Sequence, residues 1–355
     1  MTIADVTVMG AGIFGLAIGW ECARRGARVT VIERDRIGAG ASGGIVGALA
    51  PHVPEQWNPK KAFQLDSLTM AGRFWATVAE ASGRDPGYAR LGRVQPLANE
   101  AAVELARARA EGARGLWRGS AEWRVVPASN DGWQPPSASG WIVEDTLSAR
   151  LHPRQAVTAL AGAIRAKEGM VHEAASEPRA GVCEPGGNAV VIWATGVQGL
   201  ADLSAAFARP VGGGVKGQAA LFACDAAGRP QIFADALHVV PHGDGTVAVG
   251  STSERDYTSA GDTDARLEAL IEKARALCPA LRGAPVIERW AGLRPRAKSR
   301  APVLGAWPGR PGHFVANGGF KIGFGMAPKV AAAMADLALD GHDTIPAGFR
   351  VEDSL

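Results

Sequence analysis

IADVTVMGAGIFGLAIGWECARRGARVTVIE, residues 3–33, is the stretch that decides the fold. Residues 3–9 are rich in β-branched side chains and predict a short buried strand. An apolar run over residues 13–25 predicts a helix that Gly26 ends. Residues 28–32 predict a second strand, and Glu33 follows it. The stretch therefore predicts a β-turn-α-β unit of about 30 residues, the context in which a glycine-rich turn binds a dinucleotide.

The turn between the first strand and the helix has the spacing GxGxxG. Gly10 allows the tight turn, Gly12 lets the backbone approach a pyrophosphate, and Gly15 lets the helix pack closely on the strand. The phosphates would face the helix N-terminus, where free N–H groups and the helix dipole favour anions. We expect this turn to bind the cofactor through Gly10, Gly12, Ile13, Phe14 and Gly15.

Glu33 closes the second strand, eighteen residues after Gly15. A carboxylate at this point accepts hydrogen bonds from a ribose diol and repels a 2′-phosphate, which disfavours NADP. Glu33 and the adjacent Arg34 are therefore expected cofactor residues. A chain with 46 glycines can hold such a cluster by chance, but strand, helix, second strand and acid all agree here. FAD and NAD both use this unit, so it does not separate them.

The composition excludes several classes of protein. The 355 residues carry a net charge of +3, too weak to indicate a nucleic-acid partner, although residues 294–300 are locally basic. The apolar stretches are broken well short of a membrane span, and no basic segment precedes the first one. We expect a soluble cytoplasmic protein without a metal site. Its four cysteines are far apart and predict reduced thiols: Cys22, Cys183, Cys224 and Cys278.

Alternating strand and helix patterns at both ends enclose a β-rich middle. Helices are predicted over 59–81, 101–112, 152–167, 264–277 and 327–339, and strands over 91–97, 140–145, 189–194, 215–223, 231–251 and 314–317. The fold class is therefore α/β, a Rossmann-like nucleotide-binding domain with an inserted antiparallel-sheet (α+β) substrate domain. We expect residues 1–80, 141–205 and 290–355 in the first domain, and 81–140 and 206–289 in the second.

Four later segments carry a family resemblance. GASGGIVGALAP at residues 40–51 resembles the D-amino-acid oxidase and glycine oxidase family of FAD-dependent oxidoreductases. WATG at 193–196, WAGLRP at 290–295 and NGGFKIG at 317–323 look like three further segments of that family, in the family's order. The resemblance covers most of the chain and implies FAD as the cofactor. The FAD would be non-covalent, because no cysteine or histidine falls within an attachment motif of the family.

The resemblance assigns roles to residues of these segments. Ser42 and Gly43 would bind the pyrophosphate, while Gly47, Ala48 and Leu49 would lie along the flavin ring. Thr195 and Gly196 follow a buried strand at its carboxyl end, where α/β sheets place ligands, although an ordinary strand-to-turn junction looks the same. The last segment would approach the edge of the flavin on which negative charge develops: Gly318, Gly319, Phe320, Lys321, Ile322 and Gly323.

Three residues are candidates for the chemistry itself. In the family the arginine that matches Arg294 grips the substrate carboxylate, and a guanidinium suits that role. By itself, Arg294 also fits a surface cluster of basic residues. Lys321 stands where the family has arginine, so it keeps the charge and loses the two-pronged geometry, which argues against the simplest amino-acid substrates. His52 faces the active site or is structural, and His238 and His242 either line the substrate side or face solvent.

These features predict an FAD-dependent oxidoreductase that oxidises the C–N bond of a small amine or amino acid, such as glycine, sarcosine or a D-amino acid. One alternative is oxidation of a secondary amine on modified tRNA, which requires a basic face and a steep salt dependence; the modest net charge argues against it. A second is a non-catalytic flavin-binding subunit, in keeping with Lys321 and only two tyrosines. An NAD-dependent dehydrogenase requires the later motifs to be coincidental. The sequence does not indicate the electron acceptor or the oligomeric state.

Overall fold

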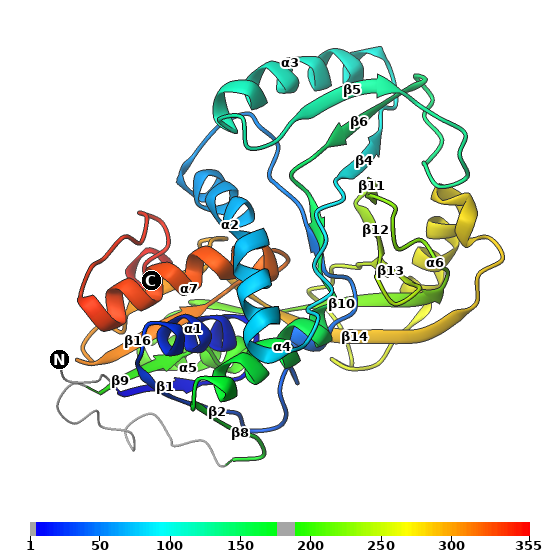
Figure 1. Ribbon diagram of the computed structural model, residues 1–355. Helices are drawn as coiled ribbons and strands as arrows, with labels where there is room; N and C mark the ends of the chain where they lie inside the picture. Colours follow the sequence, from blue (N-terminus) through cyan, green and yellow to red (C-terminus); the bar gives the residue numbers. More distant parts are fainter. Residues whose placement is uncertain (1–4, 176–188) are drawn as a thin grey trace.

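The computed structural model describes residues 5–175 and 189–355. Two sheets organise these residues (Figure 1). The first has six strands, which pair in parallel except at the β15–β16 edge. In spatial order they are β15 (Val303–Ala306), β16 (His313–Asn317), β9 (Val190–Trp193), β1 (Asp5–Met9), β2 (Arg28–Ile32) and β8 (Met170–His172).

Four helices pack together on the first sheet and share one hydrophobic core with it (Figure 1). They are α1 (Ile13–Arg24), α2 (Pro59–Ser82), α4 (Pro153–Ala166) and α7 (Gly323–Asp340). The boundaries of α2 follow from its sequence: Asn58 accepts a hydrogen bond from the Lys61 N–H, Pro59 occupies the first turn, and Gly83 ends the helix at a φ of +64°. No helix within the two described ranges is long and apolar enough to cross a membrane.

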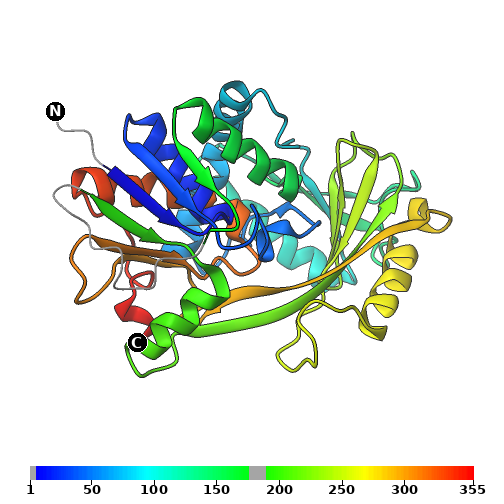
Figure 2. The same cartoon turned by 90° about the horizontal axis from the view of Figure 1, so that it is seen from below.

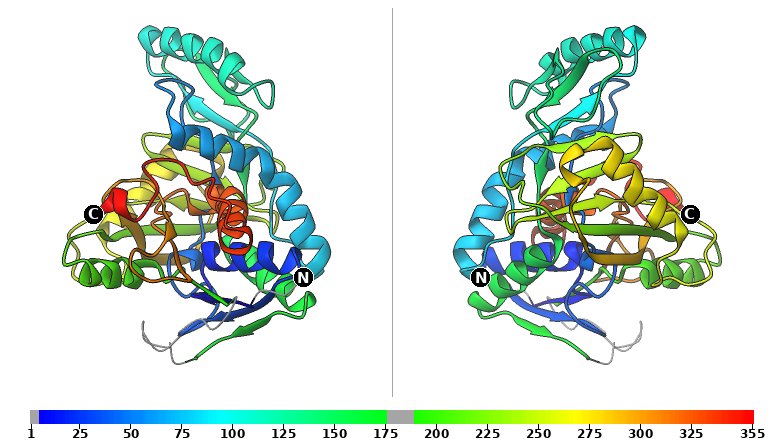
Figure 3. Two further views of the ribbon diagram at one scale, coloured as in Figure 1. Left: turned by 90° about the vertical axis from the view of Figure 1, so that its left-hand side faces the viewer. Right: turned by 90° about the vertical axis from the view of Figure 1, so that its right-hand side faces the viewer.

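The second sheet has eight strands and is antiparallel except where β11 meets β4. Its order is β14 (Val286–Ala297), β10 (Gly212–Ala223), β13 (Thr246–Gly250), β12 (Leu237–Pro241), β11 (Gln231–Ala234), β4 (Arg93–Pro96), β6 (Trp141–Asp145) and β5 (Trp123–Pro127). Helix α6 (Ala265–Leu277) packs against β10, β12 and β13, and α3 (Glu100–Leu116) packs against β5 and β6. Figure 3 shows α3 with these strands at the end of the molecule farthest from the first sheet.

Three connections complete the architecture. Helix α5 (Gly196–Ala206) leaves the carboxyl end of β9 and contacts β10, β14 and β16. The short strands β3 (Ala48–Leu49) and β7 (Ala149–Arg150) pair with each other. Figure 2 shows the long strands β10 and β14 running from the first sheet across to the second. The fold class is the predicted one, an α/β nucleotide-binding part joined to a substrate part built on an antiparallel sheet.

Strand β14 is the main element that the sequence patterns did not predict. Its twelve residues include Gly292 and Pro295, which argue against a central strand. The structure resolves the conflict because β14 is the edge strand of its sheet. Proline is tolerated on an edge strand, since its missing backbone N–H can fall on the side that has no neighbouring strand. The expected domain limits also differ from the sheets. Strand β6 and residues 290–297 of β14 belong to the second sheet, whereas the sequence patterns assigned these residues to the first domain. Cys183 and residues 3 and 4 of the first predicted strand lie outside the described residues.

The glycine turn is the tightest point of the first sheet. Gly10 has a φ of +100°, and a Cβ there would lie 2.6 Å from the carbonyl oxygen of Ala194. A Cβ at Gly15 would lie 2.0 Å from the carbonyl oxygen of Gly10. Since real Cβ atoms do not come this close to a backbone oxygen, both positions require glycine. Helix α1 therefore begins directly at the end of β1, with its N-terminus beside the strand ends.

Replacing Gly15 with alanine is expected to destabilise the fold. The added methyl group meets backbone that has no free space to move into, so we expect a loss of about 3 kcal/mol in the free energy of unfolding. Gly115→Ala is the matched control, because Gly115 lies inside α3 with nothing within 4 Å of its Cβ position. There alanine should add about 0.5–1 kcal/mol. Urea unfolding of both variants measures the difference, and equal stability of the two would contradict the packing described.

Candidate active site

A cavity of about 770 Å³ lies between the two sheets, within the usual size range of cofactor and ligand pockets. One wall is built by the carboxyl ends of β1, β2, β9 and β16 and by the N-terminus of α1. The opposite wall comes from β4, β11, β12 and β14 of the second sheet. The cavity therefore joins the nucleotide-binding turn to the substrate part, as a flavin enzyme requires.

Most of the residues predicted for the site line this cavity. The lining includes Gly10, Gly12, Ile13, Phe14, Glu33, Arg34, Ser42, Gly47, Ala48, His52, Thr195, Gly196, Arg294, Gly318, Gly319, Phe320, Lys321, Ile322 and Gly323. Three predicted cofactor residues lie behind the wall instead. Gly15 packs on Gly10, Gly43 packs on the carbonyl of Gly38, and the Leu49 side chain is fully buried in the core. These three shape the wall without forming its surface.

The N-terminus of α1 offers donors to a phosphate. Ser42 accepts a hydrogen bond from the Ile13 N–H at 2.9 Å, which places its hydroxyl at the first turn of the helix. Within the described residues, the N–H groups of Gly12 and Phe14 find no acceptor. These open donors and the positive end of the helix dipole fit the pyrophosphate of a dinucleotide.

Glu33 holds the backbone at the other side of the turn. Its carboxylate accepts hydrogen bonds from the Ala11 N–H at 2.7 Å and from the Asp35 N–H at 2.9 Å. Each oxygen keeps a lone pair for a further donor, and Glu33 lines the cavity. This geometry fits the two hydroxyl groups of a ribose.

Glu33→Gln is expected to weaken FAD binding while leaving the fold intact. The amide keeps one acceptor, but it loses the charge and places two donors where the ribose also donates. Because hydrogen bonds to charged groups contribute about 1.5–3 kcal/mol, we expect the Kd for FAD to rise about tenfold to a hundredfold. Flavin fluorescence titration of the apoprotein measures this constant. Glu173→Gln is the control, since Glu173 accepts the Ile37 N–H away from the cavity and should leave the Kd unchanged.

The last strand of the first sheet positions the loop after it. Asn317 ends β16 and donates a hydrogen bond from Nδ2 to the Gly196 carbonyl at 2.8 Å, while its Oδ1 accepts the Gly318 N–H at 2.7 Å. Asn317 thereby ties the segment after β9 to the segment after β16. Gly318 has a φ of +74°, and the turn that it begins brings Phe320 to the cavity.

Arg294 is buried on β14 and aimed into the cavity. Its guanidinium donates to the Ser251 hydroxyl at 2.5 Å and to the carbonyls of Lys216 and Thr252 at 3.1 and 2.6 Å. These bonds use three of the five N–H donors of the side chain. The Nε atom is buried without a partner among the described residues. Burial lowers the pKa of Arg294 to about 10, and Glu254 opposes part of that change.

Three cations surround the ring of Phe320. The guanidinium carbons of Arg294 and Arg296 lie 5.6 and 5.4 Å from the ring centroid, and Lys321 Nζ lies 5.8 Å from it. None of the three forms an ion pair with an acidic residue in the described ranges. Desolvation lowers the pKa of Lys321, and repulsion from Arg294 and Arg296 lowers it further, although Lys321 as a whole is exposed. This end of the cavity therefore attracts an anion.

His52 is fixed by a single glutamine. Its Nδ1 is hydrogen-bonded to Gln64 Oε1, which also accepts the His52 N–H at 2.9 Å. Because the amide oxygen only accepts, Nδ1 carries the proton and Nε2 keeps a lone pair. Burial lowers the pKa of His52, which favours the neutral ring. A role of His52 in the chemistry remains a prediction.

His238 and His242 occupy different places. His238 lines the cavity, whereas His242 is buried beside the loop that precedes β3 and donates from Nε2 to the Ile45 carbonyl at 2.8 Å. The ring of His242 lies 4.8 Å from that of His152, centroid to centroid. Burial lowers the pKa of His242 to about 4. His242 thus holds the loop as a neutral side chain.

This histidine makes stability depend on pH. The pKa of His242 is about 4 in the folded state and about 6.5 in an unfolded chain, so the unfolded state takes up the proton first. The stabilisation is complete above pH 6.5 and is lost as the pH falls toward 4. In His242→Gln an amide N–H replaces Nε2–H, and the side chain no longer titrates. We therefore expect the unfolding free energy to change less with pH, by the equivalent of up to one proton taken up on unfolding. Urea unfolding at pH 7, 6 and 5 measures the slope, and an unchanged slope would rule His242 out as its source.

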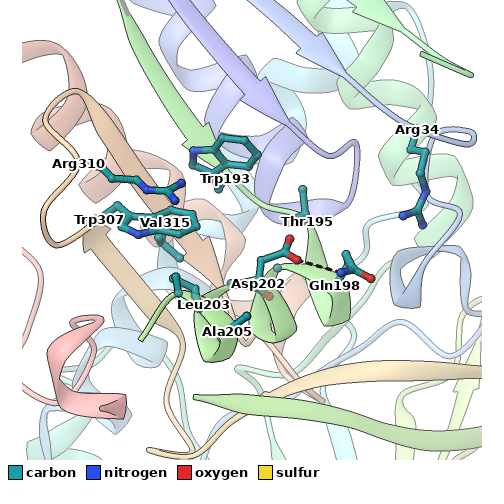
Figure 4. A pocket seen from close by; sticks show the side chains of 13 residues that line it. Arg34, Trp193, Thr195, Gln198, Asp202, Leu203, Ala205, Trp307, Arg310 and Val315 are labelled. Atoms are coloured by element: carbon teal, nitrogen blue, oxygen red, sulfur yellow. Dashed lines mark hydrogen bonds between the residues drawn. The ribbon is translucent and has the colours of Figure 1, made fainter. Parts of the chain in front are cut away.

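A second cavity, of about 560 Å³, adjoins the first (Figure 4). Both are lined by Arg34, Thr195, Gln198 and Asn317. Trp193 and Trp307 form an edge-to-face pair in it, and the Arg310 guanidinium lies 4.4 Å from the Trp307 ring. Figure 4 shows these aromatic side chains on the side away from Arg34. This cavity extends the nucleotide end of the site.

Sequence patterns missed part of the cavity wall. Arg93, Gln95 and Phe233 line it, and so does Gln64 beside His52. Arg93 and Gln95 could in part have been recognised from the sequence. They alternate with apolar residues on a predicted strand, so they share one face of it. Nothing in the sequence showed that this face meets the nucleotide-binding part.

Fold and cavity together define a flavin-dependent oxidoreductase with a separate substrate sheet. The profile of the family described as FAD dependent oxidoreductase (DAO) matches residues 5–337, and the chain belongs to this family. FAD is accordingly its cofactor.

Named relatives agree with this assignment. Glycine oxidase of Pseudomonas aeruginosa is 28% identical over 96% of this chain and 96% of its own length, and glycine oxidase of Geobacillus kaustophilus is 26% identical over 94% and 92%. The crystal structure of glycine oxidase from Geobacillus kaustophilus superposes with a TM-score of 0.81 at 21% identity, covering 99% of both chains, which shows the shared fold.

Proposed function

We propose that the protein oxidises the C–N bond of a small amino acid or N-substituted glycine whose carboxylate is held at Arg294 and Lys321. The observation that carries the proposal is the unpaired positive charge of these two side chains at the cavity. A carboxylate is the group that such a pair recognises best. The glycine oxidases among the relatives support the same substrate class.

Arg294 and Lys321 divide the task of binding the carboxylate. Three N–H donors of Arg294 are already bonded to the protein and its Nε is covered, so the guanidinium is held rigidly and offers one terminal N–H. The ammonium of Lys321 supplies the second point of attraction. This pairing explains how a lysine can serve at a position where a two-pronged arginine is expected.

The remaining side chains orient the substrate amine and exclude water. His52 presents a neutral Nε2 lone pair that can accept a hydrogen bond from the amine N–H. The rings of Phe320 and Trp290 line the cavity and remove water from the reacting carbon. Bound FAD supplies the oxidising group, which takes a hydride from the carbon attached to the nitrogen.

Anaerobic flavin bleaching tests the proposal directly. The FAD-loaded protein is mixed with glycine, sarcosine, D-alanine and D-proline, and the loss of flavin absorbance is followed in a stopped-flow instrument. We expect at least one of these compounds to reduce the flavin. Lys321→Gln should lower kcat/KM about tenfold to a hundredfold, mainly through KM, because a charged contact to the carboxylate is lost.

Lys329→Gln provides the matched control. Lys329 lies on α7, where its backbone N–H donates to the Ser67 hydroxyl at 3.2 Å, and it does not line the cavity. Its replacement should leave kcat/KM unchanged. Protein that binds FAD, yet is bleached by no amine or amino acid, would overturn the proposed function.

A further inference from the structure

One face of the second sheet carries polar side chains toward the cavity. Strand pairing places Arg93 beside Gln231 and Phe233 beside His238. Because side chains alternate along a strand, Arg93 and Gln95 share a face of β4. The alternate residues of β4, β11 and β12 point to the other face of the sheet. There they pack in a separate hydrophobic core: Val94, Ile232 and Val239. We call Arg93, Gln95 and His238 the distal wall.

Arg93 is the charged member of the distal wall. It is 5% exposed and donates from Nε to Asp145 Oδ2 at 2.8 Å. Asp145 is sealed, with a side chain that is 0% exposed and a further hydrogen bond from the Ser148 N–H at 2.8 Å. The two terminal nitrogens of Arg93 bond to no described residue and are not sealed from the cavity. Both partners of this ion pair are buried, yet the terminal nitrogens of Arg93 keep unused donors at the cavity, and its guanidinium carbon lies 5.7 Å from the centroid of the Phe233 ring, which also lines the cavity.

Two more polar groups of the distal wall have no partner. Gln95 Nε2 and His238 Nδ1 are covered and have no hydrogen bond to any described residue, although other atoms of both side chains line the cavity. An unsatisfied buried polar group costs about 1–3 kcal/mol. Burial, with repulsion from Arg93 and Lys321, lowers the pKa of His238 to about 3, so its ring is neutral. Three polar side chains of β4 and β12 thus line the cavity, and among them Arg93 has donors that are both unused and open to it.

We propose that the distal wall binds a second carboxylate of the substrate, carried by its side chain or by its amine nitrogen. This inference rests on the proposed function, in which the first carboxylate lies at Arg294 and Lys321. The two terminal nitrogens of a guanidinium match the two oxygens of a carboxylate, and Gln95 is a neutral polar neighbour on the same face of β4. Asp145 balances the charge of Arg93 when no ligand is bound. The buried arginine is therefore not left unpaired in the empty site, and its terminal nitrogens stay available for the carboxylate.

Matched substrate pairs separate this inference from simple amino-acid oxidation. Iminodiacetate is compared with N-(carbamoylmethyl)glycine, and D-aspartate and D-glutamate with D-asparagine and D-glutamine. Each pair keeps shape and length and changes only the second carboxylate into an amide. For the best pair we expect kcat/KM of flavin reduction to be at least about tenfold higher for the dicarboxylate, equivalent to about 1.4 kcal/mol. A high ratio for iminodiacetate would place the second carboxylate on the nitrogen substituent. A high ratio for D-aspartate or D-glutamate would place it on the side chain.

Two variants connect the ratio to the distal wall. Gln95→Leu removes a neutral polar side chain of the distal wall without touching the ion pair, and Arg93→Lys keeps the charge beside Asp145 but loses the paired terminal nitrogens. The lysine avoids leaving Asp145 buried and unpaired, which would threaten folding. In both variants the dicarboxylate-to-amide ratio should fall toward one through a rise in KM for the dicarboxylate. Arg229→Lys is the control, because Arg229 lies in an exposed loop before β11, pairs with Asp131 and does not line the cavity, and the ratio should persist there.

The outcomes distinguish the two proposals. If amino acids bleach the flavin but the ratio in the unaltered protein is near one, the distal wall does not bind a carboxylate and the proposed function stands. The same conclusion follows if the ratio is large but survives both Gln95→Leu and Arg93→Lys. If no compound in either panel bleaches the flavin, the proposed function fails and the inference fails with it.

Discussion

The contact between Gly15 and the Gly10 carbonyl is the constraint on which the site depends. It lets α1 start at the end of β1 and brings the open N–H groups of Gly12 and Phe14 to the edge of the sheet. Ser42 and Glu33 then bond to backbone N–H groups of the same turn, so three segments of the chain meet at one point. A side chain at either glycine would separate them.

The second sheet completes the site by supplying charge. Arg294 on β14 and Arg93 on β4 approach the cavity from different strands, while Lys321 comes from the loop after β16. Arg93 is balanced by Asp145, whereas Arg294 and Lys321 form no ion pair within the described ranges, and only the more distant charge of Glu254 acts on Arg294. Such an excess of positive charge repels itself in the empty protein, and an anionic ligand relieves that repulsion. Under the proposed function, the substrate carboxylate is thus part of the electrostatic balance of the site.

Local patterns in the sequence predicted the β-turn-α-β unit and the fold class, and most of the residues they predicted for the site line the cavity. They succeeded where a residue type has one physical reason to be present, as with Gly10 at a positive φ or Glu33 at a strand end. They failed for β14, because Pro295 and Gly292 argue against a strand unless its place at the sheet edge is known. They also missed Arg93 and Gln95, whose importance depends on which face of β4 meets the cavity, a question of tertiary packing. Leu49 shows the reverse case, a residue in a family motif whose side chain serves the core.

Strands β10 and β14 pair along almost their full lengths, from Gly212 and Ala297 at one end to Phe222 and Val286 at the other. The Phe320 N–H is bonded to the Pro295 carbonyl at 3.0 Å, and the Lys298 N–H to the Val211 carbonyl at 2.8 Å, so this ribbon is fastened to the loop after β16 and to the chain after α5. A hinge between the two sheets would have to break these bonds. We therefore expect the two halves to move as one body, with ligand exchange through rearrangement of surface segments rather than through opening of the molecule.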